Sequence, residues 1–264
     1  MNKKMAIFDD FRTDKKYDVS MLSEIGKRES QQDAAYVAAN DDMVLAILCD
    51  GMGGKNGGAL ASKTAVEAFL DFFSVYSRSD QEFNCSWTKT SVEQIDDIIY
   101  NLRDKEGNRI DCGCTLVAVM ICKNQLHWIS VGDSRLYIIR GNEIVQVSTD
   151  HNYVYELDRK LRNHEIDMKT YNANLYKKDA LISFIGMGGL TMMDISNEPF
   201  NLLKDDVVLL CTDGLYRAVN QDEICKIVET SWDMEKACIR LSYEIQCKAI
   251  KDQDNATYIL IKRG

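Results

Sequence analysis

Short apolar runs alternate along this chain with polar turns and with longer amphipathic stretches. Seven runs rich in aliphatic and β-branched residues are typical of β-strands: 44–49, 115–122, 126–131, 136–140, 144–148, 207–212 and 257–262. Five stretches repeat apolar residues at helical spacing: 58–73, 91–105, 154–161, 221–229 and 234–250. Asn220 and Glu223 have the spacing of a capping box, which marks the start of the fourth of these helices. The pattern therefore predicts a protein that mixes strands and helices.

The order of these elements predicts their arrangement. The links at 123–125, 132–135 and 141–143 have the length of hairpin turns, so we expect antiparallel neighbours in the sheets. Two helices fall before the central strands and two more lie around the last strands, so helices can cover both outer faces of two stacked sheets. We therefore expect an α+β fold, a four-layer α/β/β/α sandwich of two mainly antiparallel sheets.

Length and local composition indicate how the chain divides into domains. With 264 residues and one proline, it most simply forms one large domain over 18–264, preceded by an N-terminal extension at 1–17. A polar and weakly periodic segment at about 163–180 interrupts the apolar pattern. We interpret it as a surface flap.

Composition limits the partners and the compartment. A formal net charge of -9 argues against nucleic acid or an anionic membrane surface as the main partner, because each would need a basic face. The nine cysteines are mostly embedded in apolar runs, as expected for reduced thiols in a cytosolic protein. Residues 1–17 lack the apolar core of a signal peptide, and no run of about 18 apolar residues occurs. A cytoplasmic location is the expectation.

Acidic residues stand at the ends of four predicted strands. Asp50, Asp133 and Asp213 follow strands, and Asp254 precedes one. Carboxylates gathered at one rim of a sheet repel each other unless a cation neutralises them, and carboxylate oxygens suit Mg²⁺ or Mn²⁺. Two such ions, roughly 3.5 to 4 Å apart, can support displacement at phosphorus. Arg28 is the candidate for binding the phosphate oxygens.

Short motifs that follow one another along most of the chain resemble those of one known family. They are R-E-S-Q-Q-D at 28–33, D-G-M-G-G at 50–54, G-C-T at 113–115, V-G-D-S-R at 131–135, T-D-H at 149–151, C-T-D-G-L at 211–215 and D-N-A-T at 254–257. The chain resembles the metal-dependent serine/threonine protein phosphatases of the PPM type (type 2C), in their bacterial form. Each motif alone is weak, but their order and spacing together are specific.

The resemblance implies a role in metal binding for several matching residues. Asp50 would bridge two metal ions, with the Gly51 carbonyl on one ion and Asp213 and Asp254 on the other. Asp33 would hold a metal-bound water molecule.

It also implies how the substrate is bound and what the reaction is. Arg28 would bind the substrate phosphate, and Asp133 with Asp213 would serve a weaker third metal site. The implied reaction is hydrolysis of phosphoserine and phosphothreonine by a metal-activated water, with Mn²⁺ or Mg²⁺ as cofactor. Implied partners are phosphorylated proteins and a serine/threonine protein kinase of the same pathway.

Four positions depart from the family pattern. Gln31 replaces the usual Asn, Lys55 stands where bacterial members commonly have His, and Phe184 stands where an Arg is usual. Met52 replaces a histidine of animal members, so a general acid has to be water or another group. These departures concern the surroundings of the two-metal core.

Two other functions compete with this interpretation. Cys211 and Arg217 have the C-x-x-G-x-x-R spacing of cysteine-dependent phosphatases, in which a thiolate attacks phosphorus. Against this, Cys211 lies inside a predicted strand, where burial would keep the thiol protonated. The other alternative is a non-catalytic scaffold that binds phosphoproteins, although such a protein would be free to lose its metal carboxylates.

Overall fold

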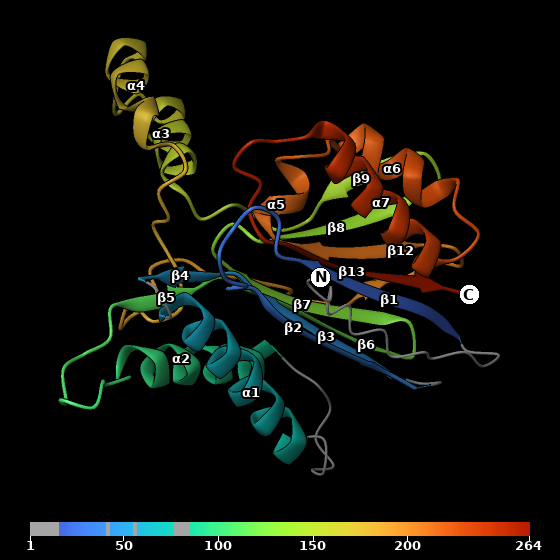
Figure 1. Ribbon diagram of the computed structural model, residues 1–264, viewed down its shortest axis with the longest axis horizontal. Helices are drawn as coiled ribbons and strands as arrows, with labels where there is room; N and C mark the ends of the chain where they lie inside the picture. Colours follow the sequence, from blue (N-terminus) through green and yellow to red (C-terminus); the bar gives the residue numbers. More distant parts are fainter. Residues whose placement is uncertain (1–15, 41–42, 55–56, 77–84) are drawn as a thin grey trace.

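Two antiparallel sheets stack face to face in the computed structural model, which describes residues 16–40, 43–54, 57–76 and 85–264 (Figure 1). The first sheet has the strand order β1 (Tyr17–Glu24), β13 (Ala256–Arg263), β12 (Val207–Cys211), β8 (Arg135–Arg140), β9 (Glu143–Gln146). The second has the order β10 (Asp194–Ile195), β7 (Gln125–Val131), β6 (Leu116–Cys122), β3 (Met43–Cys49), β2 (Ala34–Ala39), and β11 (Phe200–Asn201) also pairs with β7. A small third sheet joins β4 (Gly51–Gly53) to β5 (Cys112–Cys114).

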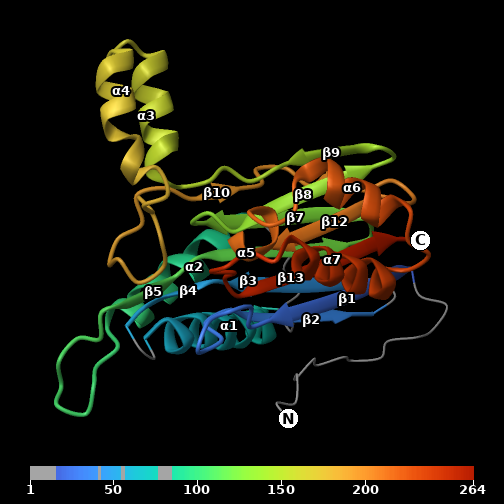
Figure 2. The ribbon, with the colours of Figure 1, turned by 45° about the horizontal axis from the view of Figure 1, so that its top comes forward.

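Helices cover the outer face of each large sheet. The helices α1 (Gly57–Tyr76) and α2 (Cys85–Tyr100) lie on the second sheet, and α6 (Gln221–Glu229) and α7 (Met234–Lys248) lie on the first (Figures 1 and 2). The short helix α5 (Asp213–Tyr216) follows β12 directly. The predicted α/β/β/α sandwich is confirmed, and so is the capping box at Asn220 and Glu223. Every helix in the described ranges is too short or too polar to span a bilayer.

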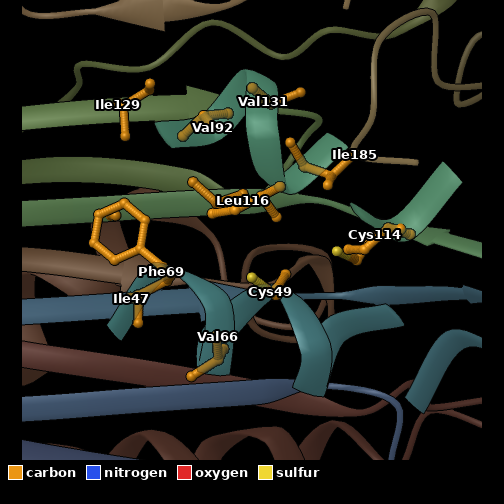
Figure 3. Close-up of a cluster of buried hydrophobic side chains, with 14 of the residues drawn as sticks. Ile47, Cys49, Val66, Phe69, Val92, Cys114, Leu116, Ile129, Val131 and Ile185 are labelled. Atoms are coloured by element: carbon orange, nitrogen blue, oxygen red, sulfur yellow. The ribbon is translucent and has the colours of Figure 1, made fainter. Parts of the chain in front are cut away.

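Three clusters of buried apolar side chains fill the spaces between the four layers. In β3, Leu45 and Ile47 face α1 and α2, whereas Val44 and Leu48 face the other sheet. Figure 3 shows part of the first cluster, in which Ile47 and Phe69 lie side by side. Because the central strands are buried on both faces, they appear in the sequence as continuous apolar runs without alternation.

One predicted hairpin is wrong. The link at 132–135 does not join neighbouring strands, because β7 belongs to the second sheet and β8 to the first. The chain therefore crosses between the sheets here, although the link is as short as a hairpin turn. The other two links do form hairpins, β6 with β7 and β8 with β9.

The segment predicted as a flap projects from the sandwich. The segment contains α4 (Met168–Asn174) and a 3-10 turn at Leu175–Lys177. These pack with the preceding helix α3 (Tyr153–Arg162) as a helical hairpin (Figure 2). No residue of α4 is buried. Two backbone hydrogen bonds close the base of this hairpin. The Tyr153 amide donates to the Ala180 carbonyl at 2.8 Å, and the Val154 amide donates to the Lys178 carbonyl at 3.0 Å.

Candidate active site at the shared rim of the sheets

The acidic residues predicted from the sequence meet at one end of both sheets. The start of β2 lies beside the end of β3, since Ala34 pairs with Cys49, and the start of β13 lies beside the end of β12, since Tyr258 pairs with Cys211. The residues that flank these strand ends therefore share a rim. A hydrogen bond of 3.0 Å from the Thr212 hydroxyl to Asp33 Oδ2 joins the two sheets there.

Asp50 stands where β3 passes into β4. Its amide donates to the Thr115 hydroxyl at 2.9 Å, and its carbonyl accepts from the Thr115 amide at 2.8 Å. The next residue, Gly51, donates to the Gln32 carbonyl at 3.1 Å. A side chain at Gly51 would collide with the Gly58 carbonyl, so only glycine allows the start of α1 to approach this closely.

Asp33 is buried and is only partly satisfied by hydrogen bonds. Its Oδ2 accepts from Thr212, whereas its Oδ1 has no partner among the described residues. Burial raises its pKa to about 7, with repulsion from Asp213 and Asp254 adding to the effect and the hydrogen bonds from Thr257 and Thr212 opposing it. An unpaired carboxylate oxygen in a buried site is available for a cation or for water.

The side chain of Asn255 holds the loop that carries Arg28. It accepts from the Gln32 amide at 2.8 Å and donates to the carbonyls of Ile25 and Ser30 at 2.8 and 3.2 Å. Arg28 is 57% exposed at the mouth of the rim, and its Nη2 lies 2.6 Å from Asp254 Oδ2. The structure thus brings the predicted phosphate ligand next to a predicted metal ligand.

Asp133 sits on the crossing between the sheets. Gly132 takes a φ of +102°, which glycine adopts without strain. The buried His151 clamps this turn, because its amide donates to the Gly132 carbonyl at 2.9 Å and its Nδ1 accepts from the Gly132 amide at 3.1 Å. This histidine therefore has a structural role in the turn. Burial raises the pKa of Asp133 to about 6, and repulsion from Asp213 and Asp150 contributes.

Asp213 opens α5 and is paired with Arg217, the C-cap residue of that helix. Arg217 Nε lies 3.1 Å from Asp213 Oδ2, while Asp213 Oδ1 is buried and has no hydrogen-bond partner in the described chain. Burial raises the pKa of Asp213, Arg217 lowers it, and Asp254 raises it. The end of α5 also approaches Asp133, with the Tyr216 hydroxyl 3.4 Å from Asp133 Oδ2.

Mutual repulsion links all five carboxylates. The pKa of Asp50 is raised well above its ordinary value by burial and then by four acidic neighbours: Asp33, Asp213, Asp133 and Asp254. A buried group of like charges is unfavourable unless cations enter it. Arg28 and Arg217 supply two positive charges, so further cations are needed to neutralise the five carboxylates of this rim.

The donor set fits divalent cations, although the side chains are not arranged around one. No group of three or more His, Cys, Asp or Glu side chains within the described ranges could hold a metal ion as it stands. Asp254 and Asp213 are instead directed at Arg28 and Arg217. Carboxylate oxygens are ligands that Mg²⁺ and Mn²⁺ prefer, and two of those at the rim are buried without a hydrogen-bond partner among the described residues. The rim is thus equipped for metal-dependent chemistry on a phosphate ester.

Three of the four departures from the family pattern can be placed. Gln31 accepts from the Asp33 amide at 3.1 Å and donates to the Ser23 hydroxyl at 2.8 Å, so it steadies Asp33. The ring of Phe184 lies against Gly113, and Met52 belongs to β4. Lys55 lies outside the described residues.

The thiol of Cys211 is in the wrong place for nucleophilic attack. It is fully buried in β12, within the cluster that lies under α6 and α7. Burial raises its pKa above the ordinary range of a thiol, so the thiolate does not form at neutral pH. The guanidinium of Arg217 contacts the carboxylates of Asp133 and Asp213, so it does not form a phosphate-binding site around this sulfur. The cysteine-dependent alternative is therefore not favoured.

Comparison with known proteins agrees with this geometry. Residues 22–246 match the family described as Protein phosphatase 2C. The serine/threonine phosphatase stp of Listeria welshimeri is 30% identical over 241 residues, covering 90% of this chain and 92% of that protein. The solved structure of the S. agalactiae serine/threonine phosphatase has a TM-score of 0.79 at 24% identity, covering 94% of this chain and 100% of the other. The catalytic domain of the phosphatase PstP, solved with two manganese ions, has a TM-score of 0.71 at 20% identity, covering 93% and 97%.

The chain belongs to the Protein phosphatase 2C family, the metal-dependent serine/threonine protein phosphatases of the PPM type. The resemblance inferred from the motifs is thereby confirmed, and the two solved structures confirm the fold. The protein is an enzyme that depends on divalent metal and acts on phosphorylated proteins.

Several supporting residues were not singled out from the sequence. Thr212, Thr115 and Asn255 lie inside the recognised motifs, but nothing in those motifs shows which loop each side chain binds. From the sequence, Arg217 fits only the C-x-x-G-x-x-R spacing of the cysteine alternative. Its spacing of four residues from Asp213 was the available signal, because a helix brings such residues together.

Proposed function

We propose that this phosphatase removes phosphate from phosphoserine and phosphothreonine at the rim, with two Mn²⁺ or Mg²⁺ ions and a third ion at a weaker site. The observation that carries the proposal is the group of mutually repelling carboxylates, in which Asp33 Oδ1 and Asp213 Oδ1 are buried and have no hydrogen-bond partner in the described part of the chain. When bound, the ions lower the pKa of a water molecule and neutralise the phosphate charge.

We assign the metal ligands as the family resemblance implies. Asp50, the Gly51 carbonyl, Asp213 and Asp254 would hold the two ions, with Asp50 shared between them. Support comes from the shared rim and from the rigid joint between β3 and β4, which fixes Gly51 against the start of α1. Asp254 must leave Arg28 to bind an ion. Asp133 with Asp213 forms the weaker third site.

Arg28 and Asp33 act on the substrate and on water. In place of its present contact with Asp254, the exposed guanidinium of Arg28 would donate two parallel hydrogen bonds to phosphate oxygens. Arginine does not give up its proton at neutral pH, so the leaving group takes its proton from water or another group. Asp33 Oδ1, which has no partner among the described residues, would accept a hydrogen bond from the attacking water and orient it.

We further propose a single-domain organisation with a substrate-contacting flap, and a cytoplasmic location. Residues 18–264 form one phosphatase domain after an extension at 1–17, although β1 already begins at the buried Tyr17. The segment at 163–180 is a flap that contacts the substrate protein. The free thiols of the described cysteines support a cytoplasmic location. A serine/threonine kinase of the same pathway is its counterpart.

The test of this function is hydrolysis of p-nitrophenyl phosphate and of phosphoserine and phosphothreonine peptides by the purified protein. We expect turnover with Mn²⁺ or Mg²⁺, complete loss in EDTA, and recovery when Mn²⁺ is added back. A phosphotyrosine peptide serves as the control for substrate class. Turnover that is insensitive to EDTA would contradict the proposal, and so would a clear preference for phosphotyrosine.

A further inference from the structure

Arg217 lies against both carboxylates that we assign to the third metal site. Its Nε is 3.1 Å from Asp213 Oδ2, and its Nη2 is 3.8 Å from Asp133 Oδ2. The two aspartate side chains are 13% and 10% exposed, whereas Arg217 is 49% exposed. The guanidinium therefore covers the pair of carboxylates from the solvent side.

The same guanidinium also reaches the flap. Arg217 Nη2 lies 3.7 Å from Asp179 Oδ1, and Asp179 directly precedes Ala180 at the base of the helical hairpin. This is an ion pair between the flap and the end of α5. Arg217 thus has two sets of partners, one inside the rim and one on the flap.

We propose that Arg217 is a built-in cation that competes with the third metal ion for Asp133 and Asp213. This inference rests on the proposed function, because it uses the same metal site. A metal ion between the two carboxylates and a guanidinium on those same carboxylates would repel each other strongly at this separation. The third ion therefore binds only when Arg217 moves away from the pair, and Asp179 stabilises the displaced side chain.

The competition couples the flap to the metal site. If Asp179 favours the displaced position of Arg217, it strengthens binding of the third ion, and binding of that ion must favour the Arg217–Asp179 pair to the same degree. An ordinary surface ion pair would have no such effect, since pairs of exposed charges contribute little. What sets Arg217 apart is that two of its partners are almost buried.

The deciding measurement counts Mn²⁺ ions and their affinities by equilibrium dialysis with elemental analysis, in the wild type, Arg217→Gln and Arg217→Lys. We expect two tight ions in all three proteins. In Arg217→Gln the weakest ion should bind at least about tenfold more tightly, because a nearby positive charge has been removed. Arg217→Lys should stay close to the wild type, because it keeps the charge.

Arg240→Gln is the matched control, since it removes one positive charge from the exposed face of α7, where Arg240 donates to Thr230 and Ser231. It should leave all ion affinities unchanged. Thermal unfolding in EDTA checks that each variant is folded. Equal weak-ion affinity in the wild type and Arg217→Gln would overturn the inference while leaving the two-metal enzyme intact. A wild type that binds no tight Mn²⁺ would overturn the proposed function as well.

Substitution of Asp179 in the flap provides a second test of the inference by the same metal-binding measurement. Asp179→Asn should weaken the third ion in the wild-type background, because the displaced Arg217 loses its partner. In the Arg217→Gln background the same change should have no effect. An equal effect of Asp179→Asn in both backgrounds would show that Asp179 acts through its own charge, which would overturn the link between flap and ion.

Discussion

The Thr212 hydroxyl donates to Asp33 Oδ2 at 3.0 Å and accepts from the Thr257 amide at 3.0 Å. This buried side chain thus binds Asp33, which directly precedes β2 of the second sheet, and the backbone of β13 in the first sheet. Thr212 follows β12 directly and is the N-cap residue of α5, which begins at Asp213.

Thr212→Val should destabilise the protein without changing its shape. The substitution keeps the volume but leaves Asp33 and the Thr257 amide without their partner, at a cost of about 1 to 3 kcal/mol. In a chain of this size that corresponds to a fall of roughly 3 to 10 °C in Tm. Thermal unfolding with Mn²⁺ present measures it, and Thr230→Val at the exposed end of α6 is the control. An unchanged Tm would show that this bond contributes nothing to stability.

Asp50→Asn should abolish hydrolysis while making the metal-free protein more stable. The neutral side chain removes a charge that four carboxylates repel, and it also removes the bridging ligand. We expect a loss on the order of a thousandfold or more in kcat. Addition of Mn²⁺ should raise the Tm of the wild type but hardly that of the variant. Asp97→Asn on the exposed face of α2 should match the wild type in both assays. Wild-type turnover by Asp50→Asn would refute the assignment of this residue.

Arg28→Ala should weaken the use of substrate more than the turnover. Loss of the two hydrogen bonds to phosphate is expected to raise KM on the order of tenfold, with a smaller change in kcat. Steady-state kinetics on a phosphothreonine peptide separate the two constants. The neighbouring exposed Lys27 offers a control, and Lys27→Ala should leave KM unchanged. If Arg28→Ala lowers only kcat, Arg28 does not bind the ground-state phosphate.

The metal-free protein should lose stability as the pH rises from about 4 to about 7. Burial raises the pKa of Asp33 to about 7 and that of Asp133 to about 6, from 3.8. A carboxyl whose pKa is raised on folding stabilises the fold below its unfolded pKa, and that stability is lost as pH passes the folded pKa. In EDTA we expect Tm to fall by at least about 3 °C between pH 5 and pH 8. Mn²⁺ at pH 8 should restore it. A Tm in EDTA that rises over this range would contradict the prediction.

Cys211→Ser should retain most of the activity. The thiol packs in the core beneath α6 and α7 and has no access to substrate, so only a modest loss of stability is expected. Peptide hydrolysis and thermal unfolding measure the two effects. A folded but inactive Cys211→Ser, together with an EDTA-resistant wild type, would favour the cysteine-dependent mechanism.

The parts of the fold that could be predicted are those whose side chains are buried on both faces. Strands such as β3 and β12 appear as apolar runs, and the aspartates that follow them mark the rim. By contrast β1 and β2 were missed, because they mix polar and partly exposed residues and lie at or near the sheet edges. The helix α4 was missed because it buries nothing, so no apolar periodicity records it.

The site was predictable in its residue types but not in its pairing. The sequence places Asp254 and Arg28 more than 200 positions apart, and nothing in it shows that they lie within 2.6 Å of each other. The same holds for Arg217 and Asp133, because Asp133 lies on the crossing from β7 to β8 and Arg217 follows α5. Such contacts depend on how the loops between strands are folded, and their hydrogen bonds are made by residues such as Asn255 and His151.

Two loops that carry site residues at the rim run from one sheet to the other. One, 25–33, carries Arg28 and Asp33 from β1 to β2, and the other, 132–134, carries Asp133 from β7 to β8. A shift of one sheet relative to the other would therefore move Arg28, Asp33 and Asp133 relative to the other carboxylates. Packing between Leu48 and its neighbours in the inter-sheet core sets the alignment of the two sheets, and with it the spacing of the carboxylates. We therefore expect substitutions deep in this sandwich to change the spacing of the carboxylates as well as the stability of the fold.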